Sequence, residues 1–118
     1  MRDVAIIGVG MIPFGRRDED SLLDMLAYSS LKALDDAGQG DGGVDAVYVA
    51  NMGAGILQHQ TSVASALVDR LGLLPAAADV VENGPAPARQ PSRMACWQSH
   101  QVIMTWCWLP VARRCVKW

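Results

Sequence analysis

The apolar positions in the first part of the chain fall into five segments, three of them short and rich in small or β-branched residues. Val4–Gly10 (VAIIGVG) is continuously apolar and closed by glycines, which predicts a buried strand. Val44–Asn51 (VDAVYVAN) alternates like a second strand. Ala77–Glu82 (AADVVE) predicts a third, because it ends at the turn dipeptide Asn83-Gly84.

The other two segments carry apolar residues at the three-four spacing of one helical face. The first starts at Ser21, which forms a capping-box pattern with Asp24, and it stops at Gly38. The second runs from a cap at Thr61 or Ser62 to a glycine. The residues predicted to face the core are Leu23, Leu26, Ala27, Ser30, Leu34 and Ala37 in the first helix and Val63, Leu67, Val68 and Leu71 in the second.

The alternation of strands and helices predicts an α/β fold, a mostly parallel sheet with helices on both faces. Sheets of this kind carry their chemistry in loops at the carboxyl ends of strands. Here those loops are Met11–Asp20, Met52–Gln60 and the segment from Asn83 onward. His59 is the one histidine of this region. Because it has no Asp or Cys partner at a useful spacing, it is expected to be a surface residue rather than a base.

Gly8 and Gly10 invite comparison with a dinucleotide-binding fingerprint, but the pattern is incomplete. Pro13 stands where the third glycine is required, and it would interrupt the helix that must follow. The two glycines are therefore predicted to form a tight turn after the strand.

Composition changes abruptly within Glu82–Trp97 (ENGPAPARQPSRMACW). Residues 1–86 contain no Cys or Trp, and their twelve acidic and five basic residues give a net charge of −7. Residues 87–118 contain three Cys, four Trp and five basic residues with no acid, a net charge of +5. The basic residues are spread among Trp, Cys and Met rather than forming a dense run, which argues against nucleic-acid binding.

Length and cysteine content indicate at most one small domain without disulfides. The chain has 118 residues, and its three cysteines, at spacings of 11 and 8, fit neither a disulfide framework nor a zinc site, so no metal is expected. The amino terminus lacks the long apolar core of a secretory signal. Polar residues interrupt Met94–Ala112, the one candidate membrane span. A soluble cytoplasmic protein that does not bind membranes is the expectation.

The run VAIIGVGMIPFGRR, followed by SLLDMLAYSSLKALDDAG, VDAVYVANM and VENGPA, resembles the amino-terminal part of the thiolase superfamily. The similarity covers Met1 to about Ala86 and is greatest to sterol-carrier-protein-type and acetyl-CoA acetyltransferase-like members. The resemblance implies a layered α/β protein of two similar halves that works as a dimer or tetramer. It also implies an acyltransferase of lipid metabolism that forms or cleaves carbon-carbon bonds in 3-oxoacyl-CoA, with acyl-CoA as substrate and no separate cofactor.

In thiolases the loop after the third strand carries a nucleophilic Cys at the start of a buried helix, where backbone N–H groups and the helix dipole stabilise the thiolate. In this chain the resemblance places Pro85 at that position. Proline fits the first turn of a helix, but it has no group that can attack a thioester. The resemblance therefore implies no catalytic residue here, and it places the family's catalytic His and second Cys outside this chain.

Residues 87–118 do not follow the thiolase pattern, but another reading frame restores it. The third base of each codon can be joined to the first two bases of the next. Several residues are then fixed whichever synonymous codons are used: Met94 with Ala95 gives Gly, and Met104 with Thr105 gives Asp. With ordinary choices elsewhere, the new reading includes Asp-Val-Val-Leu-Val-Ala-Gly-Gly-Glu-Lys-Met, as in thiolases.

We therefore expect residues 1–86 to be a truncated thiolase-like domain and residues 87–118 to be an out-of-frame, irregular tail. In this interpretation a single base is lost near the codons of Ala86 and Pro87. A helix-like stretch around Met94–Trp108 is expected only as an accident of apolar collapse. Loss of the family's fourth strand would leave the first strand with an open edge, which predicts low stability and aggregation.

Two functions stay open at this point. The first is a fragment of an acyl-CoA acyltransferase that is inactive alone. The second is a small standalone α/β binding or interaction module whose Trp-rich tail docks on a partner or a membrane surface.

Overall fold

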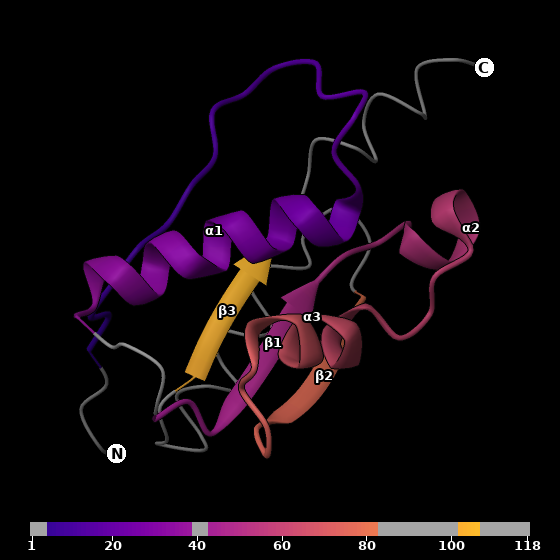
Figure 1. Cartoon of the computed structure of the whole chain (residues 1–118). Coiled ribbons are helices and arrows are strands. Elements are labelled where there is room, and N and C mark those ends of the chain that lie inside the picture. Colours follow the sequence, from indigo (N-terminus) through magenta and orange to yellow (C-terminus); the bar gives the residue numbers. More distant parts are fainter. Residues whose placement is uncertain (1–4, 39–42, 83–101, 107–118) are drawn as a thin grey trace.

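The computed structural model describes residues 5–38, 43–82 and 102–106, which form three helices and three strands (Figure 1). In chain order these are α1 (Leu22–Asp36), β1 (Ala46–Ala50), α2 (Ala54–Gln58), α3 (Val63–Leu71), β2 (Ala77–Val81) and β3 (Val102–Trp106). The predicted α/β class is confirmed. So are the helices at α1 and α3 and the strands at β1 and β2.

β1 is the central strand of a parallel three-stranded sheet with the order β2-β1-β3. It pairs with β2 from Ala46 opposite Ala77 to Ala50 opposite Val81. Along its other edge it pairs with β3 over the same residues. All of β1 is buried, which is typical of a central strand in a parallel sheet.

The two longer helices begin and end where the sequence predicts. The backbone N–H of Asp24 donates to Ser21 Oγ, and the N–H of Ser21 donates to Asp24 Oδ2, both at 3.1 Å, which completes the capping box. Beyond the other end of α1, Gly38 has a positive φ of 64°. α3 is capped by Gly72 with a φ of 66°. A left-handed glycine is a common way for a helix to stop, because it has no Cβ to clash.

The core lies between the sheet and the helices α1 and α3. Its members are Leu22, Leu26, Ala27, Val47, Val49, Ala54, Val63, Ala64, Leu67, Val68 and Leu73. Most of the positions predicted to face inward are buried, and Leu23, Leu34, Ala37 and Leu71 are half-buried. An ion pair between Arg70 and Asp24 also ties α3 to α1.

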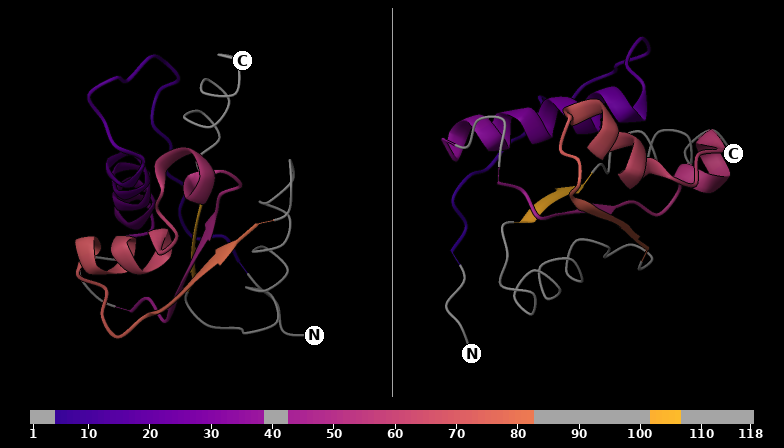
Figure 2. Two further views of the ribbon diagram at one scale, coloured as in Figure 1. Left: turned by 90° about the vertical axis from the view of Figure 1, so that its right-hand side faces the viewer. Right: turned by 60° about the horizontal axis from the view of Figure 1, so that its bottom comes forward.

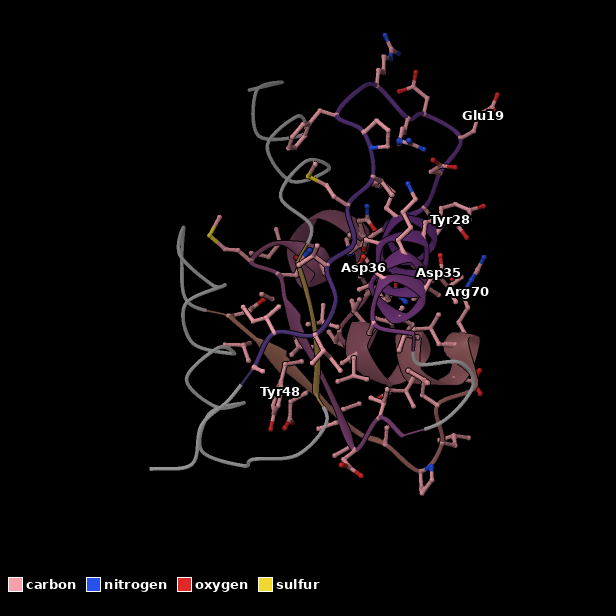
Figure 3. All side chains as sticks on the ribbon, turned by 90° about the vertical axis from the view of Figure 1, so that its left-hand side faces the viewer. Glu19, Tyr28, Asp35, Asp36, Tyr48 and Arg70 are labelled. Atoms are coloured by element: carbon pink, nitrogen blue, oxygen red, sulfur yellow. The ribbon has the colours of Figure 1, made fainter. Side chains whose placement is uncertain are left out.

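Figure 2 shows α1 and α3 side by side on one face of the sheet, and the two helices contact each other. Tyr48 points from β1 away from α1 (Figure 3), yet it is only 2% exposed, so the second face of the sheet is covered there too. A helix on that second face would come from outside the described residues, and that part of the predicted architecture stays a prediction.

The strand predicted at Val4–Gly10 is wrong for the residues that the structure describes. Ala5–Gly10 lies outside the sheet and against α1, with Ile6 80% and Val9 70% exposed. The two edges of β1 are occupied by β2 and β3, so no position beside β1 is left for this segment. Its glycines permit a close approach to α1, since a Cβ at Gly10 would lie 2.1 Å from the carbonyl oxygen of Ser29.

Two short elements were not predicted. Residues 102–106 were expected to be irregular or helix-like, but they form β3. Val, Ile, Thr and Trp favour strands, and pairing with β1 satisfies backbone groups along the edge of a central strand. α2 lies in the predicted loop Met52–Gln60, and its five residues are too few to show a helical period.

Candidate site at the carboxyl edge of the sheet

The loops that follow β1 and β2 leave the same edge of the sheet. The two strands are parallel, and Ala50 at the end of β1 pairs with Val81 at the end of β2. The Met11–Asp20 loop leads into the start of α1 on the side toward which the strands point (Figure 1). The prediction of a loop at the carboxyl end of a strand is therefore confirmed for Met52–Gln60, whereas Met11–Asp20 follows no strand, because Ala5–Gly10 lies outside the sheet. The segment from Asn83 onward, with Pro85, lies outside the described residues.

Asn51 fixes the start of the loop after β1. Its residue is 2% exposed, and its Oδ1 accepts hydrogen bonds from the backbone N–H groups of Gly53 and Ala54, each at 2.8 Å. Its own backbone N–H donates to the Val81 carbonyl oxygen at 3.4 Å. Asn51 therefore connects the ends of both strands to the first turn of α2.

The Nδ2 group of Asn51 is buried and has no acceptor among the described residues. Buried amide donors nearly always have a partner, so this group is the clearest candidate at this edge for binding a carbonyl oxygen or another acceptor. Sequence reasoning missed Asn51. The available signal was a polar residue directly after a buried strand, at the position where a parallel sheet presents its side chains to ligands.

His59 is an exposed residue, as predicted. It caps α2 in a left-handed conformation with φ of 53°, and its backbone N–H donates to the Ala54 carbonyl. Histidine at such a φ is uncommon but is among the side chains that tolerate it. Within the described part of the chain the His59 ring has no hydrogen bond or ion pair to a carboxylate, and this part holds no thiol, so His59 acts there as a cap.

The described residues contain no group of three or more His, Cys, Asp or Glu side chains that could hold a metal ion. Asp35 and Asp36, which are labelled in Figure 3, lie at the end of α1 rather than at the carboxyl edge of the sheet. One carboxyl group departs clearly from its ordinary pKa. Hydrogen bonds from the side chain and backbone of Ser21, with the charge of Arg70, lower the pKa of Asp24. The shift is a consequence of the capping box, because hydrogen bonds donated to a carboxylate favour its ionised form.

Comparison with known proteins identifies relatives of this chain, which the geometry of this edge alone does not. No family model matches the chain. The acetyl-CoA acetyltransferase of Methanothermobacter thermautotrophicus is 42% identical over 82 residues, and that of Methanocaldococcus jannaschii is 39% identical over 82 residues. These matches support an amino-terminal segment of the thiolase family in this chain.

Each match covers 70% of this chain but only 21% of the relative, so the chain spans about a fifth of the length of the curated relatives it matches. The thiolase-family resemblance of the sequence is thereby confirmed. The α/β arrangement of α1, β1, α3 and β2 is consistent with part of a thiolase half-domain. Within residues 5–38, 43–82 and 102–106, no helix is both long enough and apolar enough to cross a membrane.

Proposed function

We propose that this chain is an amino-terminal fragment of an acyl-CoA acyltransferase and that the 118-residue polypeptide does not transfer acyl groups by itself. The observation that carries the proposal is its similarity to two acetyl-CoA acetyltransferases. By resemblance, an intact relative acts on acyl-CoA as a dimer or tetramer.

Pro85 is the reason for the proposed inactivity. The thiolase pattern requires a thiolate at this position, and a thiolate is what attacks the thioester carbonyl. Proline supplies neither a nucleophile nor a backbone N–H. The described residues offer no substitute, since they contain no Cys and their single histidine, His59, is exposed and makes no side-chain hydrogen bond or ion pair with them.

We also propose that residues 87–118 are read in a shifted frame, and their composition supports this. Trp and Cys are frequent in the tail because TGG and TGC arise when GTG and CTG codons for Val and Leu are read one base out of step. The thiolase-like segment would then continue in the displaced frame. The codons of the tail test this directly.

Incubation with acetyl-CoA tests the proposed inactivity. We expect the purified chain to release CoA no faster than buffer does, and we expect no acetyl group on residues 83–93 by mass spectrometry. A full-length acetyl-CoA acetyltransferase from one of the two archaea serves as the positive control. Turnover of acetyl-CoA by the purified chain at a rate that scales with its concentration would contradict the proposal.

One observation favours the second function, a standalone α/β interaction module. β3 comes from the tail, yet it pairs with all five residues of β1. A tail that belongs to the fold would behave in this way, whereas nothing selects an accidental tail to fit the sheet.

Tryptophan fluorescence separates the two functions, because all four tryptophans lie in the tail and none lies in residues 1–86. In the fragment, the emission is that of exposed tryptophan and does not change when the helices melt. In the module, the emission is that of buried tryptophan and shifts in the same transition as the far-UV circular dichroism.

A further inference from the structure

Ala5–Gly10 and Val102–Trp106 both have the composition of a strand that could pair with β1, but only the edge of β1 opposite β2 is available to them. β2 occupies one edge of β1, and β3 occupies the other. Ala5–Gly10 is apolar and β-branched, yet Ile6, Ile7 and Val9 are exposed beside α1. Apolar residues in a row at the surface lose the free energy that burial would give them, about 1.5–3 kcal/mol for each fully buried Ile or Val.

The path of the chain indicates which position would suit Ala5–Gly10. β1 and β2 are joined by α3, and α3 packs against both strands that it connects. α1 precedes β1 in the same way, and it packs over β3. In a parallel unit the helix covers the strand before it and the strand after it. The strand expected under α1, next to β1, is therefore the one that precedes α1 in the chain.

The connection is long enough for this rearrangement. Ala5–Gly10 already lies against α1, where the Val9 N–H donates to Asp36 Oδ2 at 2.8 Å. Residues 11–20 link it to the start of α1 and can span roughly 33 Å when extended. The segment can thus change position while α1 stays in place.

We propose that Ala5–Gly10 and Val102–Trp106 compete for the same edge of β1, so that this edge binds residues 5–10 whenever β3 leaves it. β3 holds the edge in this structure for a physical reason. It contains no glycine, whereas Gly8 and Gly10 each weaken a strand by about 0.5–1 kcal/mol. This inference is independent of the proposed acyltransferase ancestry, because it depends only on the pairing within this chain.

Proline substitution in β3 of the full chain tests the competition. N–H groups along a strand point alternately to its two sides, so one of any two adjacent residues donates toward β1. The double substitution Ile103→Pro and Met104→Pro therefore removes at least one such donor and disrupts the pairing. Val116→Pro is the matched control, since it places proline in the same tail beyond β3.

Hydrogen exchange followed by mass spectrometry reads the result. In the unmodified chain and in the control, we expect Val102–Trp106 to be protected, and we expect Ala5–Gly10 to exchange freely except at the Val9 amide, which donates to Asp36. In the double variant, we expect exchange at Ala5–Gly10 to slow by about tenfold or more, while Ala46–Ala50 stays protected. Fast exchange at Ala5–Gly10 in the double variant contradicts the proposal. So does loss of protection at β1, because the segment would then have failed to replace β3.

A second test needs no disruption of the sheet. Ile7→Lys places a charge in the competing segment, where Ile7 is 59% exposed in this structure, and it should leave the folded state intact. If the segment competes for β1, this substitution weakens the competitor, and exchange at Val102–Trp106 becomes slower. Ile56→Lys on exposed α2 is the control and should change nothing there. Equal exchange at β3 in both variants would overturn the proposal.

Discussion

Truncation of Leu26 in α1 measures whether the core is fixed and closely packed. Leu26 is 0% exposed and belongs to the core between the helices and the sheet. Leu26→Ala removes three carbon atoms, which at ~0.8 kcal/mol per buried CH₂ corresponds to about 2.4 kcal/mol. The cavity left behind raises the expected loss to about 3–4 kcal/mol.

Leu31 provides a control in the same helix. It is 51% exposed, so Leu31→Ala removes the same atoms and changes helix propensity equally, but it loses at most about 1.2 kcal/mol of burial. The free energy of unfolding is measured by urea denaturation with far-UV circular dichroism. We expect the two variants to differ by about 2 kcal/mol or more. Equal stabilities within about 0.5 kcal/mol would refute the reasoning, because loosely packed side chains do not distinguish the two positions.

Three further predictions follow from individual contacts. Since the folded-state pKa of Asp24 is lowered, the stability that this group contributes is complete above about pH 4 and is lost as pH falls through the folded pKa. The melting temperature of Asp24→Asn should therefore fall less on acidification than that of the unmodified chain, and an equal fall would contradict this. Gly10→Ala should separate residues 5–14 from α1 and speed amide exchange at Val9, whereas Gly15→Ala, whose Cβ has no neighbour within 4 Å, should not. Equal exchange at Val9 in the two variants would contradict the packing of this segment against α1. Asn51→Ala should lower the free energy of unfolding, measured by urea denaturation, by about 1–3 kcal/mol, because the N–H groups of Gly53 and Ala54 lose their acceptor. A decrease under about 0.5 kcal/mol would show that the loop does not depend on this side chain.

Elements defined by local signals could be predicted from the sequence. The start of α1 depends on Ser21 and Asp24, three residues apart, and its end depends on the nearby Gly38. The burial of β1 follows from its own run of apolar and β-branched residues. Such features require no knowledge of the rest of the chain, because the partners lie within one helical turn or one strand.

The position of the first apolar segment could not be predicted in this way. Ala5–Gly10 has the composition of a buried strand, but whether it joins the sheet depends on which segment pairs with the edge of β1. That competitor, Val102–Trp106, lies more than ninety residues away along the chain. The local sequence pattern shows that a segment can form a strand. Which of two such segments pairs with β1 is decided by tertiary contacts.

The candidate site was only partly predictable for a related reason. The rule for parallel sheets identified the loop after β1, since it depends on topology alone. It did not identify Asn51, because burial of a polar side chain is visible only when the strand ends are packed together. The meaning of Pro85 came from the resemblance to thiolases, and the resemblance is supported by the two archaeal relatives.

The nucleotide sequence of the gene from the codon of Ala86 to that of Trp118 tests most directly the claim that this chain is an interrupted thiolase. Displaced by one base, these codons should encode a small-residue helix followed by Asp-Val-Val-Leu-Val-Ala-Gly-Gly-Glu-Lys-Met. Codons that give a stop or an unrelated sequence in that frame would contradict the claim and leave the tail as a genuine part of the protein.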